Sequence, residues 1–301
     1  MSELLSSYKN GSYNVSIFSD GTKIRETESD EFIPEFPETM DVCISTLCNN
    51  RCEFCYANCS PQGYNADFDE YFNNGFFDSI HPYTELAINI NSIWHPGLFN
   101  FLEKMKERNI IVNATISQLD FERLYDVIKS LVNKKLIWGL GVSLINPTKH
   151  FIELIKEFPN AVIHLINGIV SPDQIKKLSD NDLKILILGF KQVGRGINYY
   201  ENGAMEIIRR QNWIHNNLHI MAKHFNIICF DNLALKQLDV KSLLTEESWN
   251  ESYMGDDGLF SFYINLVDGT FSKNSLSDIH YPINGRTVTE CFDFIRNGGK
   301  E

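Results

Sequence analysis

Four of the seven cysteines of the chain lie close together in the segment CNNRCEFCYANC, which runs from Cys48 to Cys59. The first three have the spacing C-x3-C-x2-C, and Cys59 extends it to C-x3-C-x2-C-x3-C. In a reducing compartment, thiols clustered in this way bind a metal or take part in redox chemistry more often than they form disulfides. The segment therefore predicts a thiolate-bound metal centre, and its place in the fold becomes the first question.

The segment follows the first of several short β-branched runs that alternate with helical patterns. We expect strands at DVCIST (41–46), ELAINI (85–90), IIVNATIS (110–117), WGLGVSL (138–144), AVIHLI (161–166), LKILILG (183–189) and NIICFD (226–231). The helical patterns between them cover 95–108, 120–134, 146–158, 171–179 and 203–225. This alternation predicts an α/β fold of buried strands in a parallel sheet, either a complete or partial barrel or an open doubly wound sheet. Parallel α/β proteins place their active sites at the carboxyl ends of such strands, where the cysteines lie.

Two flanking regions interrupt the alternation. YNVSIFSDGTKIRE (13–26) and GLFSFYINLVDGTFSKNS (258–275) each carry an Asp-Gly pair between alternating residues, which is a hairpin signal. TVTECFDFIRNG (287–298) has the pattern of a closing helix. We expect an N-terminal β-hairpin extension (1–36), a core (37–235) and a C-terminal hairpin and helix extension packed on that core (236–301).

Composition restricts the class of protein. The 301 residues are 43% hydrophobic and 22% charged, as in ordinary globular proteins, and no apolar run has the length of a signal peptide or a membrane span. We therefore predict a soluble, cytoplasmic protein without a membrane partner. The net charge of −12 argues against a protein that wraps long nucleic acid, although it does not exclude a nucleotide substrate.

The cysteine motif resembles a known family signature. C-x3-C-x-aromatic-C, here with Phe54 before Cys55, in the loop after the first strand of a βα repeat is typical of radical S-adenosylmethionine (SAM) enzymes, and the resemblance covers roughly residues 37 to 235. The segments FIPEFPETMDVCIST, ILGFKQVGRG, FDNLAL and YMGDDG are similar to those of an uncharacterised radical SAM group from phages and bacteria, which brings no established reaction.

The resemblance implies a partial (βα)6-type TIM barrel in which Cys48, Cys52 and Cys55 hold three irons of a [4Fe–4S] cluster. It implies that the fourth iron chelates the amino and carboxylate groups of SAM. One electron, supplied by a donor such as flavodoxin or ferredoxin, then cleaves the C5′–S bond. The resulting 5′-deoxyadenosyl radical takes hydrogen from a small-molecule, nucleotide or peptide substrate.

Two alternatives stay open. Cys59 supplies a fourth thiol, and four thiolates suffice for a structural zinc site in a non-catalytic α/β binding protein. Structural zinc usually joins two separated cysteine pairs, whereas these four lie in one segment, which favours the iron–sulfur cluster. The second alternative is a fold that keeps its cluster but cleaves SAM poorly. Cys43, Cys229 and Cys291 lie in apolar runs and are expected to pack in the core.

Polar residues collect where the expected strands end. They are Asn89, Asn91, Thr115, Ser117, Gln118, Ser143, Asn146, Asn167, Lys191, Arg195, Asp231 and Asn232. Burial of so many amides and hydroxyls is costly unless they bond to each other, to water or to a ligand. The set predicts a pocket, and the other interpretation is that its members are helix caps and turn formers.

From this set we select the cofactor-binding candidates Asn89, Asn91, Ser117, Ser143, Asn167, Lys191 and Arg195. Asn89, Ile90, Asn91 and Ser92 stand where radical SAM enzymes usually carry glycines that meet the amino group of SAM, and their carbonyl groups could accept from an ammonium. Ser143 matches the family's polar contact to the SAM carboxylate or ribose. In GFKQVGRG, Arg195 could clamp a carboxylate or phosphate, unless Lys191 and Arg195 belong to a solvated loop. MGDDG (254–258) is interpreted as a turn rather than a cation site.

Overall fold

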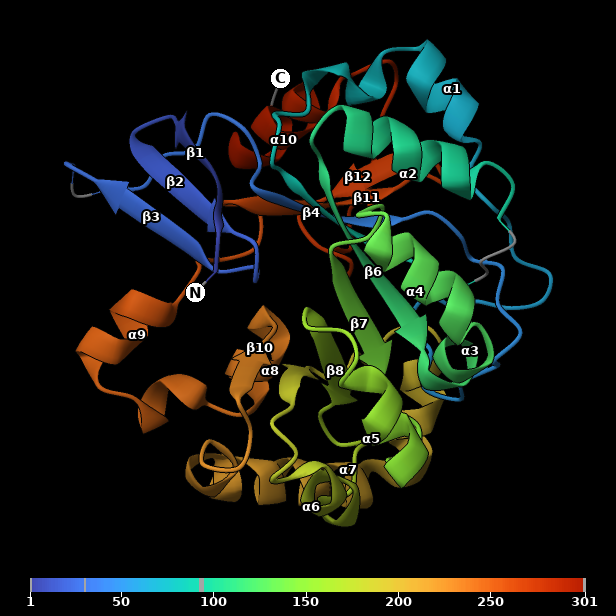
Figure 1. Ribbon diagram of the computed structural model, residues 1–301, viewed down its shortest axis with the longest axis vertical. Coiled ribbons are helices and arrows are strands. Elements are labelled where there is room, and N and C mark those ends of the chain that lie inside the picture. The colour runs from blue at the N-terminus through green and yellow to red at the C-terminus, as the bar shows by residue number, and fades with distance from the viewer. Residues whose placement is uncertain (1, 30, 92–94, 300–301) are drawn as a thin grey trace.

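The computed structural model describes residues 2–29, 31–91 and 95–299. It is a mixed α/β structure with a small antiparallel sheet beside a large sheet (Figure 1). The small sheet contains β1 (Leu4–Asn10), β2 (Tyr13–Phe18) and β3 (Lys23–Thr27). The large sheet contains β4 (Thr39–Cys43), β5 (Glu85–Asn89), β6 (Ile111–Ser117), β7 (Gly139–Ser143), β8 (Ala161–Ile166), β9 (Lys184–Leu188), β10 (Ile227–Phe230), β11 (Ser261–Asn265), β12 (Thr270–Ser272) and β13 (Tyr281–Pro282).

The described helices lie between these strands in the chain or follow the last of them. They are α1 (Phe68–Asn73), α2 (Leu98–Glu107), α3 (Gln118–Arg123), α4 (Tyr125–Asn133), α5 (Lys149–Ile155), α6 (Pro172–Leu178), α7 (Arg195–Met221), α8 (Asn232–Gln237), α9 (Glu246–Ser252) and α10 (Val288–Arg296), with 3-10 turns η1 (Phe76–Ser79) and η2 (Val240–Leu243). Within the described ranges, none of these helices combines the length and hydropathy that a bilayer span requires.

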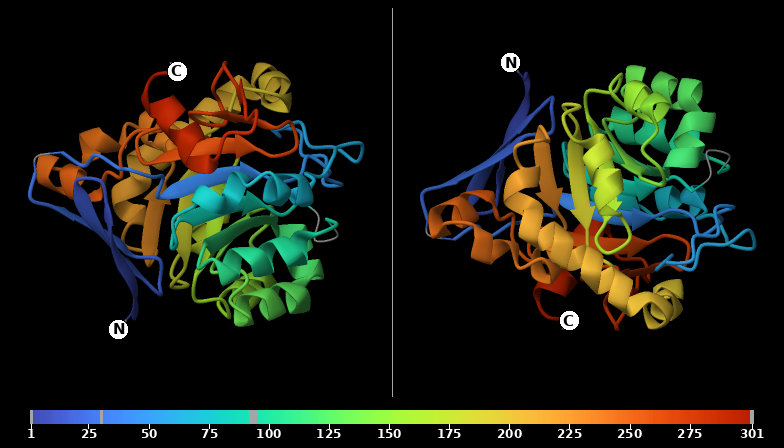
Figure 2. Two further views of the ribbon diagram at one scale, coloured as in Figure 1. Left: turned by 90° about the horizontal axis from the view of Figure 1, so that it is seen from above. Right: turned by 90° about the horizontal axis from the view of Figure 1, so that it is seen from below.

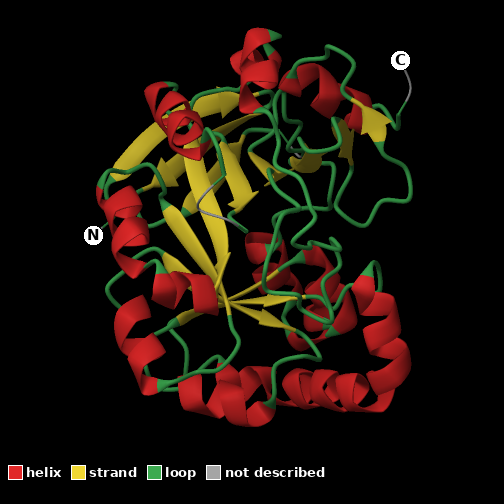
Figure 3. Cartoon of the chain, turned by 90° about the vertical axis from the view of Figure 1, so that its right-hand side faces the viewer, coloured by secondary structure: helices red, strands yellow, loops and turns green. Residues whose placement is uncertain are grey.

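In the large sheet, β4 to β10 follow one another in chain order, and β11 to β13 lie on the other side of β4. The spatial order is β10-β9-β8-β7-β6-β5-β4-β11-β12-β13, and neighbours from β4 to β10 are parallel. Because the order does not reverse, the sheet has no switch point of the doubly wound kind. Crossovers of one hand then place their helices on one face of the sheet. Figure 3 shows these helices on the outside of the strands. The predicted parallel α/β sheet is confirmed.

The two faces of the sheet differ in burial. On β5, Leu86 and Ile88 are buried against α2, and on β8, Ile163 and Leu165 are buried beneath α5 to α7. Residues at the alternate positions keep partial exposure, so each strand shows a period of two. We call the face turned away from the helices the inner face. The buried positions of each strand thus lie on the helix-covered face, whereas the inner face is the more exposed one.

The C-terminal hairpin belongs to the large sheet. Strand β11 lies parallel to β4, with Tyr263 opposite Asp41, and β12 returns antiparallel after the Asp-Gly turn at 268–269. A capping box between Thr287 and Glu290 begins α10, which confirms the predicted closing helix. The first strand of the parallel core is therefore flanked by β5 and by the last hairpin.

The predicted N-terminal hairpin is present as β2 and β3, and β1 adds a third strand to it. Its anchor is Glu38, directly before β4, whose side chain is 1% exposed. Arg25 binds both carboxylate oxygens of Glu38 at 2.8 and 3.2 Å, and the Tyr13 hydroxyl donates to it at 2.6 Å. Lys23 bridges Glu38 at 3.3 Å and Glu85 at 2.6 Å. This buried network fixes the small sheet to the amino ends of β4 and β5.

Two helices differ from their predicted bounds. The pattern at 120–134 forms α3 and α4, because the backbone at Leu124 leaves the helical region. The helix expected to begin at Gly203 begins at Arg195, and Gly203 is a kink inside it, with φ −135° and ψ 15°. Figure 2 (right), a view from below, shows α7 crossing in front of the strands. The predicted start at Gly203 is therefore wrong, because the helix already begins at Arg195, within GFKQVGRG.

Candidate functional site

The cysteine loop, residues 44–66, leaves the carboxyl end of β4 and returns to α1. Two isolated bridges, Ser45 with Asn65 and Leu47 with Ser60, hold its two arms together. The amide of Cys48 donates to the carbonyl of Ser60 at 2.9 Å, so the arms stay paired as far as the first cysteine. In Figure 1 the loop is the blue segment to the right of β4. The fold therefore places the cysteines where the sequence predicted, at the carboxyl edge of the first parallel strand.

The thiols of the loop differ in burial and acidity. Cys48, Cys52 and Cys55 are partly buried, whereas Cys59 is only 7% exposed. Burial raises the pKa of Cys48 and Cys52, whereas a hydrogen bond from the Cys59 thiol lowers the pKa of Cys55 to about 6. The same bond raises the pKa of Cys59. Because thiolate is the form that binds metal, Cys55 is prepared for ligation, while Cys59 acts as a hydrogen-bond donor.

Two asparagines at the carboxyl end of β5 bind the cysteine loop. Asn89 accepts from the amide of Ile44 at 2.9 Å and donates to the carbonyl of Ser45 at 2.7 Å. Asn91 donates to the same carbonyl at 2.7 Å and to the sulfur of Cys59 at 3.3 Å. Ser92 lies outside the described residues. The two asparagines thus fix the first residues of the loop, Ile44 and Ser45, to the end of β5. Their contact with SAM stays a prediction.

Ser117 also meets the loop, through Asn50. Asn50 donates to the Ser117 hydroxyl at 3.0 Å and to Asp120 at 2.8 Å, while Ser117 is the N-cap of α3. Ser143 ends β7 in register with Ser117. Asn167 is fully buried and donates to Gln237 at 3.0 Å, and its Oδ1 atom has no hydrogen-bond partner in the described part of the chain. Ser117 thus serves as a cap, as the second interpretation held, and lies beside the cysteines as well.

The GFKQVGRG segment is packed against the loop. Arg195 donates to the carbonyl oxygens of Cys52 and Cys59 at 2.9 and 3.0 Å. Lys191 donates to the Ser275 hydroxyl at 2.8 Å, and its ammonium lies 3.9 Å from the centre of the Tyr56 ring. Burial lowers the pKa of Lys191. Both cations therefore have protein partners, and the proposed clamp on a carboxylate or phosphate stays a prediction.

The inner face carries ionisable residues that the sequence analysis did not select. Asp41 on β4 is accessible from the inner face, yet enclosure by the surrounding protein raises the pKa of its carboxyl. His164 on β8 lies over Gly141, where a Cβ atom would come within 2.3 Å of the imidazole. Its Nδ1 atom has no hydrogen-bond partner among the described residues. The available signal was one polar residue at an alternate position of an apolar strand, in TMDVC and in AVIHLI.

His164 should make stability depend on pH. Burial lowers its folded-state pKa to about 4 from 6.5, so a falling pH protonates the unfolded chain first. Stability is retained above pH 6.5 and is lost between 6.5 and 4, by up to about 3 kcal/mol. Urea unfolding across this range should show a smaller loss for His164→Gln than for the wild type. The exposed His150→Gln is the control, and equal slopes for wild type and His164→Gln would contradict the assignment.

The three thiols of Cys48, Cys52 and Cys55 are the kind of ligand that an iron–sulfur cluster requires. Charge on Cys55 raises the pKa of both Cys48 and Cys52, so the three thiols lie within electrostatic reach of one another. No three His, Cys, Asp or Glu side chains in the described ranges are arranged as ligands of a single metal ion. A cluster that takes one thiolate on each of three irons does not require the sulfurs to converge on one ion.

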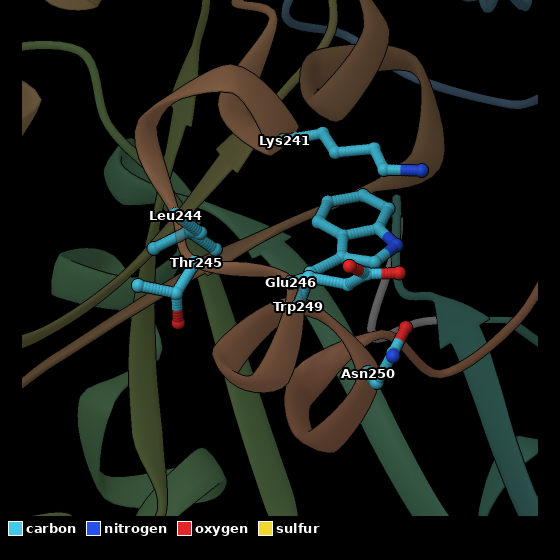
Figure 4. Close-up of a pocket in the computed structure, with 6 residues that line it drawn as sticks. All are labelled: Lys241, Leu244, Thr245, Glu246, Trp249 and Asn250. Carbon is cyan, nitrogen blue, oxygen red and sulfur yellow. The ribbon is translucent and has the colours of Figure 1, made fainter.

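A separate recess lies in the C-terminal region, away from the cysteine loop (Figure 4). It measures about 290 Å³ and is lined by Lys241, Leu244, Thr245, Glu246, Trp249 and Asn250 of η2, α9 and the turn between them. In Figure 1, α9 is at the left and the cysteine loop is at the right. We assign no role to this recess.

Comparison with known proteins identifies structural neighbours. No protein-family model matches the chain. No curated protein matches it in sequence. The fold is similar to Streptococcus suis SuiB bound to its precursor peptide SuiA, with a TM-score of 0.57, 14% identity and coverage of 86% of this chain and 65% of that chain. The structure of SuiB bound to S-adenosylmethionine matches with a TM-score of 0.56 and 14% identity, and the match covers 86% of this chain and 66% of that chain. The chain thus shares the fold of SuiB over somewhat less than two thirds of that protein's length.

Proposed function

We propose that this protein is a radical SAM enzyme, in which Cys48, Cys52 and Cys55 ligate a [4Fe–4S] cluster. The observation that carries the proposal is the position of three partly buried thiols on one loop at the carboxyl end of the first parallel strand. Similarity to SuiB, which has been solved with SAM, supports it through the fold. We further propose that the strands β4 to β9, each followed by a helix, form the partial (βα)6 barrel of that family, and that β10 extends it at the β9 edge.

The residues of the site have separate tasks in this proposal. A bound cluster would supply the electron for cleavage of SAM to methionine and a 5′-deoxyadenosyl radical. Cys48, Cys52 and Cys55 would hold the irons, and the hydrogen bond from Cys59 favours the thiolate form of Cys55. Asn89 and Asn91 fix the loop to the end of β5, and Ser143 is proposed to contact SAM. The radical would act on a substrate lying along the inner face, near Asp41 and His164.

We propose a peptide substrate and a protein electron donor. The peptide is favoured because the similar SuiB was solved with a precursor peptide, and the inner face offers polar and ionisable side chains to an extended chain. A small reduced carrier such as flavodoxin or ferredoxin would supply the electron. The narrower likeness to an uncharacterised phage and bacterial group adds no substrate to this proposal.

Anaerobic reconstitution with iron and sulfide tests the proposal. The wild-type protein should become brown, bleach with dithionite and release 5′-deoxyadenosine from SAM. A cluster that forms without release of deoxyadenosine would instead support the fold that cleaves SAM poorly. A protein that takes up no iron under these conditions would contradict both.

The zinc alternative would need the thiols of Cys48, Cys52, Cys55 and Cys59 to converge on one ion, whereas no three potential ligands in the described ranges are arranged in that way. With zinc in place, the protein should stay colourless, bind one zinc ion per chain and be indifferent to dithionite. Metal analysis of the same preparation therefore separates the two functions.

A further inference from the structure

Arg195 joins the cysteine loop to the start of α7 through three hydrogen bonds. Its backbone amide donates to the carbonyl of Cys55 at 3.1 Å, its Nε to that of Cys52 at 2.9 Å and its Nη2 to that of Cys59 at 3.0 Å. The loop follows β4 and α7 follows β9, which are five strands apart in the sheet. One residue therefore connects the carbonyls of three cysteines to a distant part of the fold.

The glycines beside Arg195 make this contact close. Gly194 has a φ of 57°, and a Cβ atom there would lie 2.3 Å from the carbonyl oxygen of Tyr56. A Cβ atom at Gly196 would lie 2.2 Å from the carbonyl oxygen of Lys191. The Phe54 ring packs edge-on against Tyr199 of α7, with centroids 5.8 Å apart. A side chain at 194 would push the loop away from the helix, so the segment is shaped for this approach.

The charge of Arg195 is directed at the loop. Its guanidinium forms no ion pair with a carboxylate in the part of the chain that the structure describes, and its partners are neutral carbonyls. Arg195 is partly buried, and because its partners are neutral, its positive charge acts on the thiols beside it. Reduction adds negative charge to an iron–sulfur cluster, and a nearby cation raises its reduction potential.

We propose that Arg195 is a positioning residue for the cysteine loop, which it holds against α7 while placing a positive charge beside the bound cluster. The holding role is a property of the folded chain itself. The effect on reduction potential rests on the proposed function.

Hydrogen–deuterium exchange on the full-length, metal-free protein tests the holding role. In Arg195→Gln, amides of residues 48–60 should exchange about tenfold faster than in the wild type, because hydrogen bonds to two carbonyls are lost. Arg195→Lys retains the charge without the planar fork and should also loosen the loop. Arg209→Gln, on the exposed face of the same helix, should leave these amides unchanged. Equal exchange in Arg195→Gln and the wild type would overturn the proposal.

Redox titration of the reconstituted proteins, followed by electron paramagnetic resonance, tests the charge. The midpoint potential should move to more negative values in Arg195→Gln and stay near the wild-type value in Arg195→Lys. A potential unchanged in Arg195→Gln would overturn this part of the proposal. If the wild type binds no iron, the proposed function and the redox role fail together, whereas the exchange comparison still decides the holding role.

Discussion

Single replacement of Cys48, Cys52 or Cys55 by alanine should leave the reconstituted protein without a stable cluster and abolish release of deoxyadenosine from SAM. A cluster with only two thiolate ligands left from the loop loses an iron corner. Iron and sulfide content, visible absorbance and product analysis measure the effect. The prediction distinguishes the three cysteines from the other four of the chain.

Cys59→Ala is the matched comparison, because it removes a thiol from the same loop. We expect it to retain the cluster, since Cys59 is a hydrogen-bond donor to Cys55 in the folded chain. Cys229→Ala, on β10, controls for the loss of any thiol; Cys229 is exposed there, so its predicted place in the core is wrong, whereas Cys43 and Cys291 are buried as predicted. If Cys59→Ala lost its metal as completely as Cys52→Ala, all four thiols would be ligands. In that case no iron would be left free for SAM.

Replacement of Glu38 by glutamine should destabilise the protein by about 3 to 5 kcal/mol. The carboxylate is 1% exposed and compensates Arg25 and Lys23, which are themselves only 12% and 8% exposed. Removing one partner of a buried ionic network leaves the remaining charges uncompensated. Chemical unfolding, with the midpoint and slope fitted separately, measures the change.

Glu153→Gln provides the control for Glu38→Gln. Glu153 pairs with Lys149 on α5, with side-chain exposures of 63% and 91%, and such a pair contributes less than about 1 kcal/mol. A loss of stability in Glu38→Gln no larger than in Glu153→Gln would mean that the network between the small sheet and β4 contributes little.

The sequence was informative where local pattern determines structure. β-branched runs such as AVIHLI and LKILILG predicted β8 and β9 because helical patterns on both sides leave little choice of element. The position of the cysteines at the end of β4 followed from the same alternation. Strand β1 was missed because LLSSYKN carries weak alternation, and its pairing with β2 supplies the order that the segment itself does not.

Local sequence pattern could not predict contacts between segments that are distant in the chain. GFKQVGRG suggested a guanidinium free to clamp an anion, whereas the fold brings Arg195 to the carbonyls of Cys52 and Cys59. The polar inner face likewise depends on how distant segments pair, and local pattern did not predict it. Asp41 and His164 are isolated in their strands, and only curvature and pairing of the sheet decide that they face away from the helices.

The parallel pairing of β11 with β4 affects how the protein is made. Asp41 and Tyr263 are separated by most of the chain, so a nascent polypeptide presents β4 with one bare edge until the last hairpin leaves the ribosome. Closure of such a long loop delays the final step of folding. Chains that stop before residue 261 lack β11, so they should expose this edge of β4 permanently and aggregate. Only chains translated through the last hairpin can cover it.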